Sequence, residues 1–243
     1  MTPARATALA ILIATLALTA RVSAQTQESI EHRYQSWLGL FAHGPIHQDL
    51  WLWVDVQPRF FEPLEPAALL VRPGLSWRVI PNFFLTAGYA WTPSWRQGPE
   101  PRSWGSLTFT DEHRVWEQAL LVLSDDASGI AGQVRVRVEQ RFRTSGGDDV
   151  GVRLRVLLRG QVPLVADRTW NLVLWDELFV PLSDSDWGQR AGFDQNRIFL
   201  GLAWQAIPTT LRLELGAMHQ WIVRDTRDTG NVIAALNAFV GWR

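Results

Sequence analysis

The 243-residue chain has no cysteine, no lysine and, beyond residue 24, no apolar run long enough for a membrane helix. Without cysteine there is no disulfide framework and no cysteine-ligated metal. Without about 20 consecutive apolar residues, this part of the chain cannot cross a bilayer as a helix. All 23 basic charges are arginines, whose planar guanidinium can bind a carboxylate through two hydrogen bonds. The formal net charge of −1 is untypical of a nucleic-acid-binding protein, so we expect no nucleic-acid partner.

The first 24 residues have the three parts of a secretory signal peptide. Arg5 supplies a positive charge, residues 6–20 form an apolar segment, and Val22-Ser23-Ala24 forms a cleavage site. The apolar segment is shorter than the roughly 20 residues that span a bilayer. We therefore expect a cleaved signal peptide at residues 1–24 and an exported mature protein at residues 25–243.

The mature segment contains long stretches in which apolar and charged residues alternate. In Gln133–Arg143, valines share one parity, while arginines and a glutamate share the other. The same alternation recurs in residues 150–159 and 211–216. A period of two is typical of a β-strand, whose side chains point to opposite faces. Behind a signal peptide, repeated strands of this kind favour a transmembrane β-barrel with an apolar exterior and a polar lumen. The 14 tryptophans agree, since indole suits membrane interfaces.

Eleven segments have a strand pattern. They are 34–41, 49–60, 67–79, 83–91, 112–123, 133–143, 150–159, 169–180, 193–205, 210–223 and 232–242. Because bacterial single-chain barrels usually have an even number of strands, we expect about twelve antiparallel strands, the twelfth near residues 25–33, with ten as the alternative. Residues 92–110 and 181–192 read as long loops, which in this class face outward, while short turns face the periplasm.

Several of these segments also carry a family resemblance. The main pieces are E-H-R-V-W-E-Q (112–118), R-V-R-V-E-Q-R-F-R (135–143), W-D-E-L-F-V (175–180) and F-D-Q-N-R-I-F-L-G (193–201). In this order and spacing they resemble the DUF2490 family, and the resemblance spans nearly all of the mature chain. It implies an outer-membrane β-barrel of Gram-negative bacteria with no established activity, and it contributes no catalytic residues.

Strand parity directs thirteen polar side chains into the lumen. They are Glu112, Arg114, Arg135, Arg137, Glu139, Arg141, Arg153, Arg155, Glu177, Gln195, Arg197, Arg212 and Glu214. Charges inside a narrow barrel must be paired or hydrated. We expect an Arg/Glu network that fills the lumen and fixes strand register. The alternative is a porin-like channel for small solutes or anions, in which the surplus of arginine recruits anions.

An enzymatic function has little support in the sequence. No serine lies in a G-x-S-x-G nucleophile motif, and His113 and His219 fall on the apolar parity near strand ends. A lipid-acting outer-membrane enzyme is a second alternative, because neighbouring strands can bring a serine and a histidine together. Asp176, Glu177 and Asp194 flank a long loop but match no metal-binding loop. We expect no catalytic residue, no metal and no cofactor.

Together these patterns predict a monomer in the outer membrane of a Gram-negative bacterium, reached by export through the periplasm. The expected partners are outer-membrane lipid and the outer-membrane assembly machinery. A small solute in the lumen is a further candidate, and the sequence is compatible with either a plugged or an open lumen.

Overall fold

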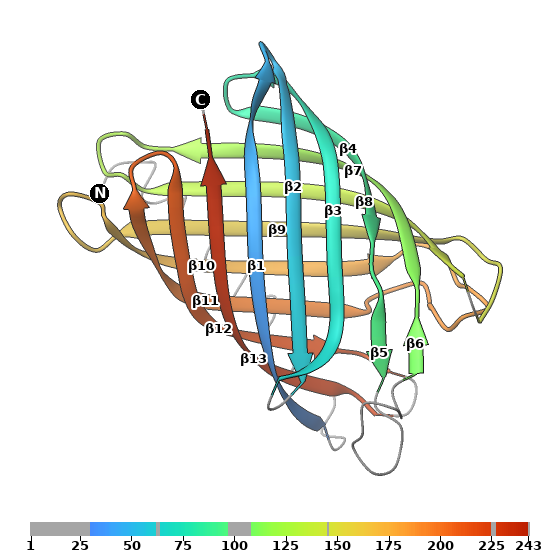
Figure 1. Ribbon diagram of the computed structural model, residues 1–243. Helices are drawn as coiled ribbons and strands as arrows, with labels where there is room; N and C mark the ends of the chain where they lie inside the picture. The colour runs from blue at the N-terminus through green and yellow to red at the C-terminus, as the bar shows by residue number, and fades with distance from the viewer. Residues whose placement is uncertain (1–29, 62–63, 97–107, 145, 225–226, 243) are drawn as a thin grey trace.

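The computed structural model describes residues 30–61, 64–96, 108–144, 146–224 and 227–242, and these residues form strands without a helix (Figure 1). The expected signal peptide at 1–24 lies outside the described residues. No helix among the described residues is long and apolar enough to cross a membrane. The strands are β1 (Glu31–His47), β2 (Leu50–Phe61), β3 (Glu65–Ile80), β4 (Phe83–Trp91), β5 (Ser94–Arg96), β6 (Thr108–Thr110), β7 (Glu112–Ser124), β8 (Ala131–Arg143), β9 (Gly151–Pro163), β10 (Trp170–Pro181), β11 (Gln195–Ile207), β12 (Leu211–Ile222) and β13 (Thr229–Gly241).

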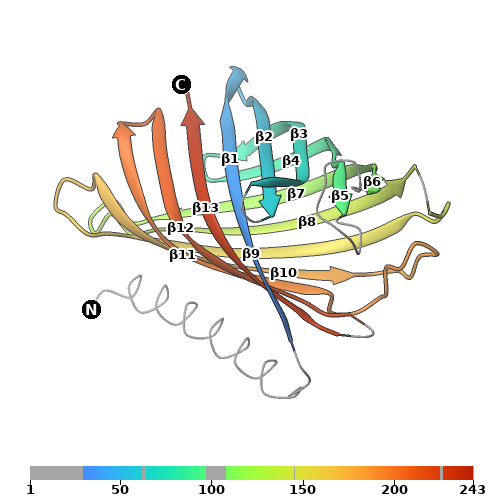
Figure 2. The ribbon, with the colours of Figure 1, turned by 60° about the horizontal axis from the view of Figure 1, so that its bottom comes forward.

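Eleven of these strands close into a barrel. Their order around the ring is β1-β13-β12-β11-β10-β9-β8-β7-β4-β3-β2, and β2 pairs with β1 to complete it. The short strands β5 and β6 form a hairpin that extends from β3 beyond the ring (Figures 1 and 2). The expected all-β barrel of about twelve strands is confirmed, with eleven strands in the ring and two outside it, and its strand pairs are antiparallel except at the closure.

The odd number of ring strands has a direct structural consequence at the closure. Consecutive strands joined by hairpins alternate in direction, so the first and last of eleven strands run the same way. β1 and β13 accordingly pair in parallel, from Glu31 opposite Thr229 to His43 opposite Gly241. The expected extra strand near residues 25–33 lies partly outside the described residues, and its described part, 31–33, is the start of β1.

The two ends of the barrel differ in the length of their connections. At one end, which we call the short-turn end, the connections have two to six residues: 48–49, 81–82, 125–130, 164–169 and 208–210. At the other, long-loop end, residues 144–150 and 182–194 are longer connections. Because β1 and β13 are parallel, β1 begins at the long-loop end and β13 finishes at the short-turn end.

Burial alternates along the ring strands, with large apolar side chains on the outside. In β11, Phe199 is fully buried while Leu200 is 53% exposed and Leu202 is 46% exposed. The same outward exposure occurs around the ring, at Leu38, Leu40, Leu75, Trp77, Leu85, Val115, Val136, Leu172, Leu215, Val232 and Leu236. The exterior is thus apolar on strand after strand, whereas many buried side chains are charged.

Aromatic side chains fill part of the lumen between the charged groups. Trp116 is fully buried and packs with Leu70 and Ala90. A Cβ atom at Gly88 would lie 2.5 Å from the Trp116 ring, and one at Gly74 would lie 2.8 Å from it. Such distances are shorter than real Cβ contacts. These two glycines therefore leave the room that Trp116 occupies inside the barrel.

Candidate functional site

All thirteen side chains that strand parity directs inward lie inside the barrel, and salt bridges connect twelve of them. They come from six consecutive ring strands, β7 to β12. The thirteenth, Gln195, lies beside Arg197 and, with the oxygen and nitrogen of its amide exchanged, accepts a hydrogen bond from Arg197 Nε at 2.6 Å. Side chains far apart in sequence therefore meet inside the barrel.

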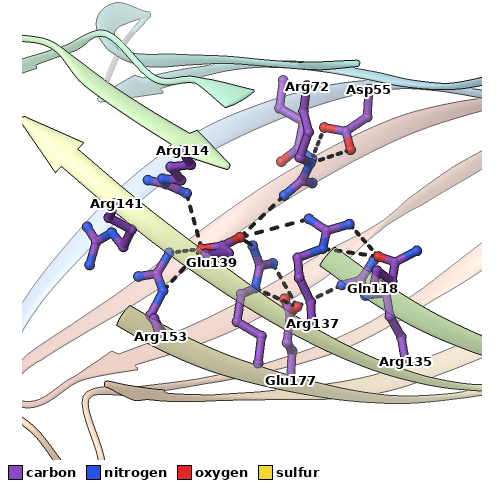
Figure 3. A network of polar contacts seen from close by, with 12 residues as sticks. Asp55, Arg72, Arg114, Gln118, Arg135, Arg137, Glu139, Arg141, Arg153 and Glu177 are labelled. Atoms are coloured by element: carbon purple, nitrogen blue, oxygen red, sulfur yellow. Dashed lines mark hydrogen bonds and ion pairs between the residues drawn. The ribbon is translucent and has the colours of Figure 1, made fainter. Parts of the chain in front are cut away.

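Glu139 is the centre of this network and is only 1% exposed. Arg153 Nη2 donates a hydrogen bond of 2.6 Å to its carboxylate (Figure 3). Arg155 Nη1 donates a second hydrogen bond of 2.6 Å. Guanidinium nitrogens of three more arginines lie 3.6 to 3.9 Å from its oxygens: Arg114, Arg72 and Arg137. A single buried carboxylate therefore faces five arginines.

Arg155 links Glu139 to a second carboxylate, Glu177. While Arg155 Nη1 bonds Glu139, its Nε and Nη2 donate to Glu177 Oε1 at 3.0 and 2.7 Å. Arg135 Nη2 donates to the same oxygen at 2.7 Å, and Arg197 Nη1 lies 4.0 Å from Oε2. Charge-assisted bonds that share one guanidinium fix the relative position of strands β8, β9 and β10.

At the long-loop end the network continues to Glu112. Arg141 binds both oxygens of Glu112, at 2.8 and 2.9 Å, and its Nη1 donates to Gln189 at 2.9 Å. Gln189 belongs to the connection 182–194, and Trp187 of the same connection stacks on the Arg141 guanidinium at 4.9 Å. This connection therefore folds over the network and packs against it.

Glu214 forms a separate cluster near the short-turn end. Arg159 donates to both Glu214 oxygens, and Arg212 Nε lies 3.0 Å from Oε1. Both guanidinium groups also lie over the Phe239 ring, at 5.6 and 4.5 Å. The lumen thus contains a large network and a smaller cluster.

Several contributors to the network are absent from the sequence-based set, namely Asp55, Arg72, Gln118, Arg143 and Gln189. Arg72 Nε donates to Asp55 at 2.7 Å, and both side chains are nearly inaccessible. Gln189 bonds Arg141 from a loop. Asp55 and Arg72 lie on the polar parity of β2 and β3, so alternation could have found them. Gln189 has no such signal, because parity does not extend into a loop.

Positive charge exceeds negative charge inside the barrel. The interior salt bridges join five carboxylates to eleven arginines: Arg72, Arg114, Arg135, Arg137, Arg141, Arg143, Arg153, Arg155, Arg159, Arg197 and Arg212. Uncompensated charge at low dielectric is costly. The interior therefore favours water or anions near these arginines.

A cavity of about 400 Å³ lies between the network and the short-turn end. It is lined by charged groups, including Arg72, Arg135, Arg155 and Glu177, and it reaches Gly241 at the end of β13. Its apolar lining includes Phe41, Phe84, Leu120, Leu157, Met218 and Phe239. The network thus occupies the long-loop half of the lumen, while the other half keeps a volume suited to a small ligand.

The residues considered as metal ligands are separated in the structure. Glu177 belongs to the network, Asp176 accepts a 2.5 Å hydrogen bond from Asn196, and Asp194 lies 3.3 Å from Arg224. Among the described residues, no group of three or more His, Asp or Glu side chains could hold a metal ion. His113, considered above for an enzyme, contacts Tyr89 and lies 3.2 Å from Asp111.

A closed β-barrel with an apolar exterior and an ion-paired interior defines the structural class of this protein. The chain belongs to the family described as "Protein of unknown function (DUF2490)", whose model matches residues 34–231, from β1 into β13. The family resemblance is therefore confirmed. The chain is also similar to an uncharacterised protein of Methylorubrum extorquens AM1, at 32% identity over 239 residues, covering 96% of this chain and 97% of that protein. No solved structure matches it.

Proposed function

We propose that this protein is an integral outer-membrane β-barrel of a Gram-negative bacterium, with a lumen plugged over its long-loop half by the Arg/Glu network. The observation that carries the proposal is the inverted distribution of side chains. Large apolar residues are exposed on successive ring strands, whereas Glu139, Arg137 and Glu214 are among the most buried groups. Soluble monomers rarely expose such extensive apolar surface, whereas a lipid-facing barrel requires it.

Strand length and end geometry support a membrane-spanning orientation. Ring strands contain 9 to 17 residues, and a tilted transmembrane strand needs about 9–11. By the general rule for this class, the short turns face the periplasm and the long loops face outward. In this orientation the cavity lies on the periplasmic side, and the connection 182–194 covers the network from outside.

The network favours a structural role over free diffusion through the lumen. Its carboxylates are nearly inaccessible, and each is shared by guanidinium groups from neighbouring strands. An open porin instead has a water-filled channel. An anion-selective channel is the second candidate, favoured by the excess of arginines over carboxylates in the salt bridges.

The membrane location predicts a specific fractionation result. In the native bacterium the protein should sediment with outer-membrane markers, and unheated samples should migrate differently from boiled samples on detergent gels, because the closed barrel stays folded. Recovery in the soluble periplasmic fraction, with no change in mobility on heating, would contradict the proposal.

A further inference from the structure

The cavity in the short-turn half of the lumen has a cationic inner end. Where it meets the network it is bounded by Arg72, Arg135 and Arg155, and it extends to Thr209 and Gly241 at the short-turn end. Glu177 lines the same end and accepts hydrogen bonds from Arg135 and Arg155. This single carboxylate offsets only part of the positive charge of the arginines that line the end. An anion bound beside them would offset the remaining positive charge.

Arg72 has a donor without an acceptor at this position. Its side chain is 2% exposed, and its Nε is bonded to Asp55. Its Nη1 has no hydrogen-bond acceptor among the described residues, and the nearest carboxylate oxygen, on Glu139, is 3.8 Å away. A buried guanidinium N–H without an acceptor is unfavourable. Because this nitrogen is itself buried, an acceptor on a ligand would satisfy it after a small shift of the Arg72 side chain toward the cavity.

Much of the wall of the same cavity is apolar. Phe84, Leu120 and Leu157 are buried side chains that line it, and Phe41 and Phe239 stack on each other with ring centroids 4.7 Å apart. A small inorganic anion would leave these surfaces in contact with water, at a hydrophobic cost. A ligand with both an anionic group and a hydrocarbon part matches the cationic end and the apolar part of the lining.

We propose that this cavity binds an amphipathic anion. Its carboxylate or phosphate group contacts Arg72 and Arg135, and its hydrocarbon chain lies against Phe84, Leu120 and Phe239. The ligand enters from the short-turn end. Binding itself does not depend on the proposed membrane location. Only the source of the ligand rests on that proposal: in the outer membrane, the ligand would come from the periplasm or from the inner leaflet of that membrane.

Contact quenching of tryptophan fluorescence tests this binding, since Trp37, Trp53 and Trp175 line the cavity. Purified full-length barrel in nonionic detergent is titrated with bromoundecanoate, an acyl chain whose bromine quenches indole on contact, and with the neutral bromoundecanol. We expect saturable quenching by the acid, displaced by undecanoate or undecyl phosphate, and much weaker quenching by the alcohol. The phosphate and carboxylate competitors distinguish a phospholipid-derived ligand from a free fatty acid.

Removal of one cavity arginine should weaken the binding selectively. Arg135→Gln should raise the Kd for bromoundecanoate about tenfold, equivalent to ~1.4 kcal/mol. The variant should fold, because Glu177 keeps its two hydrogen bonds from Arg155. Arg78→Gln is the matched control: Arg78 lies near the same end, bonds Asp49 and does not line the cavity, so its Kd should equal that of the wild type.

Three results would overturn the inference: no saturable quenching, equal quenching by the neutral alcohol, or wild-type affinity in Arg135→Gln. These measurements use purified, folded protein, so they do not depend on the membrane location. A soluble protein that still binds the acid would refute the location alone. An outer-membrane protein that fails to bind it would refute the ligand alone.

Discussion

Glu139→Gln should lower the free energy of unfolding by about 3–5 kcal/mol, the cost of leaving buried charge unpaired. The substitution keeps the side-chain shape but removes the charge that Arg153 and Arg155 each contact at 2.6 Å. Urea unfolding of the purified barrel in detergent, followed by tryptophan fluorescence, measures the change. A second substitution, Arg153→Gln, should restore part of the loss, because Glu139 is the only carboxylate among the described residues that forms a salt bridge with Arg153.

Glu117→Gln is the control for this prediction. Glu117 lies on β7, faces outward and accepts one hydrogen bond, from Gln140 at 3.1 Å. Neutralising an outward carboxylate leaves no buried arginine unpaired, so stability should be unchanged or slightly higher. Equal stabilities for Glu139→Gln and the wild type would show that water screens these charges, as in a wide, hydrated pore.

Val136→Arg should destabilise the folded barrel by about 2–4 kcal/mol, the cost of an arginine on the lipid face near the bilayer midplane. Val136 lies near the middle of β8, is 39% exposed and points away from its buried neighbour Arg137. The measurement is the yield of heat-modifiable, membrane-inserted protein, together with its unfolding free energy in lipid vesicles.

Val165→Arg provides the same substitution outside the barrel wall. Val165 is an exposed residue in the turn between β9 and β10, where an arginine reaches water. This variant should assemble like the wild type. Equal assembly of Val136→Arg would mean that the outer face of β8 does not contact lipid.

The sequence was sufficient to predict the strands because the two faces of each strand differ: one is exposed and apolar, and the other is buried and polar. Apolar residues alternate with arginines in β8 and β9, and the eleven segments predicted from alternation correspond to the eleven ring strands. The expectation of a twelfth strand came from the even-number rule for bacterial barrels. The parallel pairing of β1 with β13 makes an even number unnecessary.

The sequence alone could not predict which interior charges pair with one another. Parity places Glu139 and Glu177 inside the barrel. That Arg155 bridges them depends on the register in which the neighbouring strands pair. The contact of Gln189 with Arg141 depends on how a 13-residue connection folds back, which has no periodic signal. The position and volume of the cavity depend on this pairing, because the side chains of the network lie in the long-loop half and leave the short-turn half less filled.

Single-channel recording in planar bilayers tests the plugged lumen most directly. Purified wild-type protein, with insertion verified by protease protection, should show no stable open-channel conductance, because the network and the connection 182–194 occupy the long-loop half of the lumen. Steady, ohmic conductance from the wild type, with anion selectivity that falls in Arg135→Gln, would contradict the account and establish an anion channel.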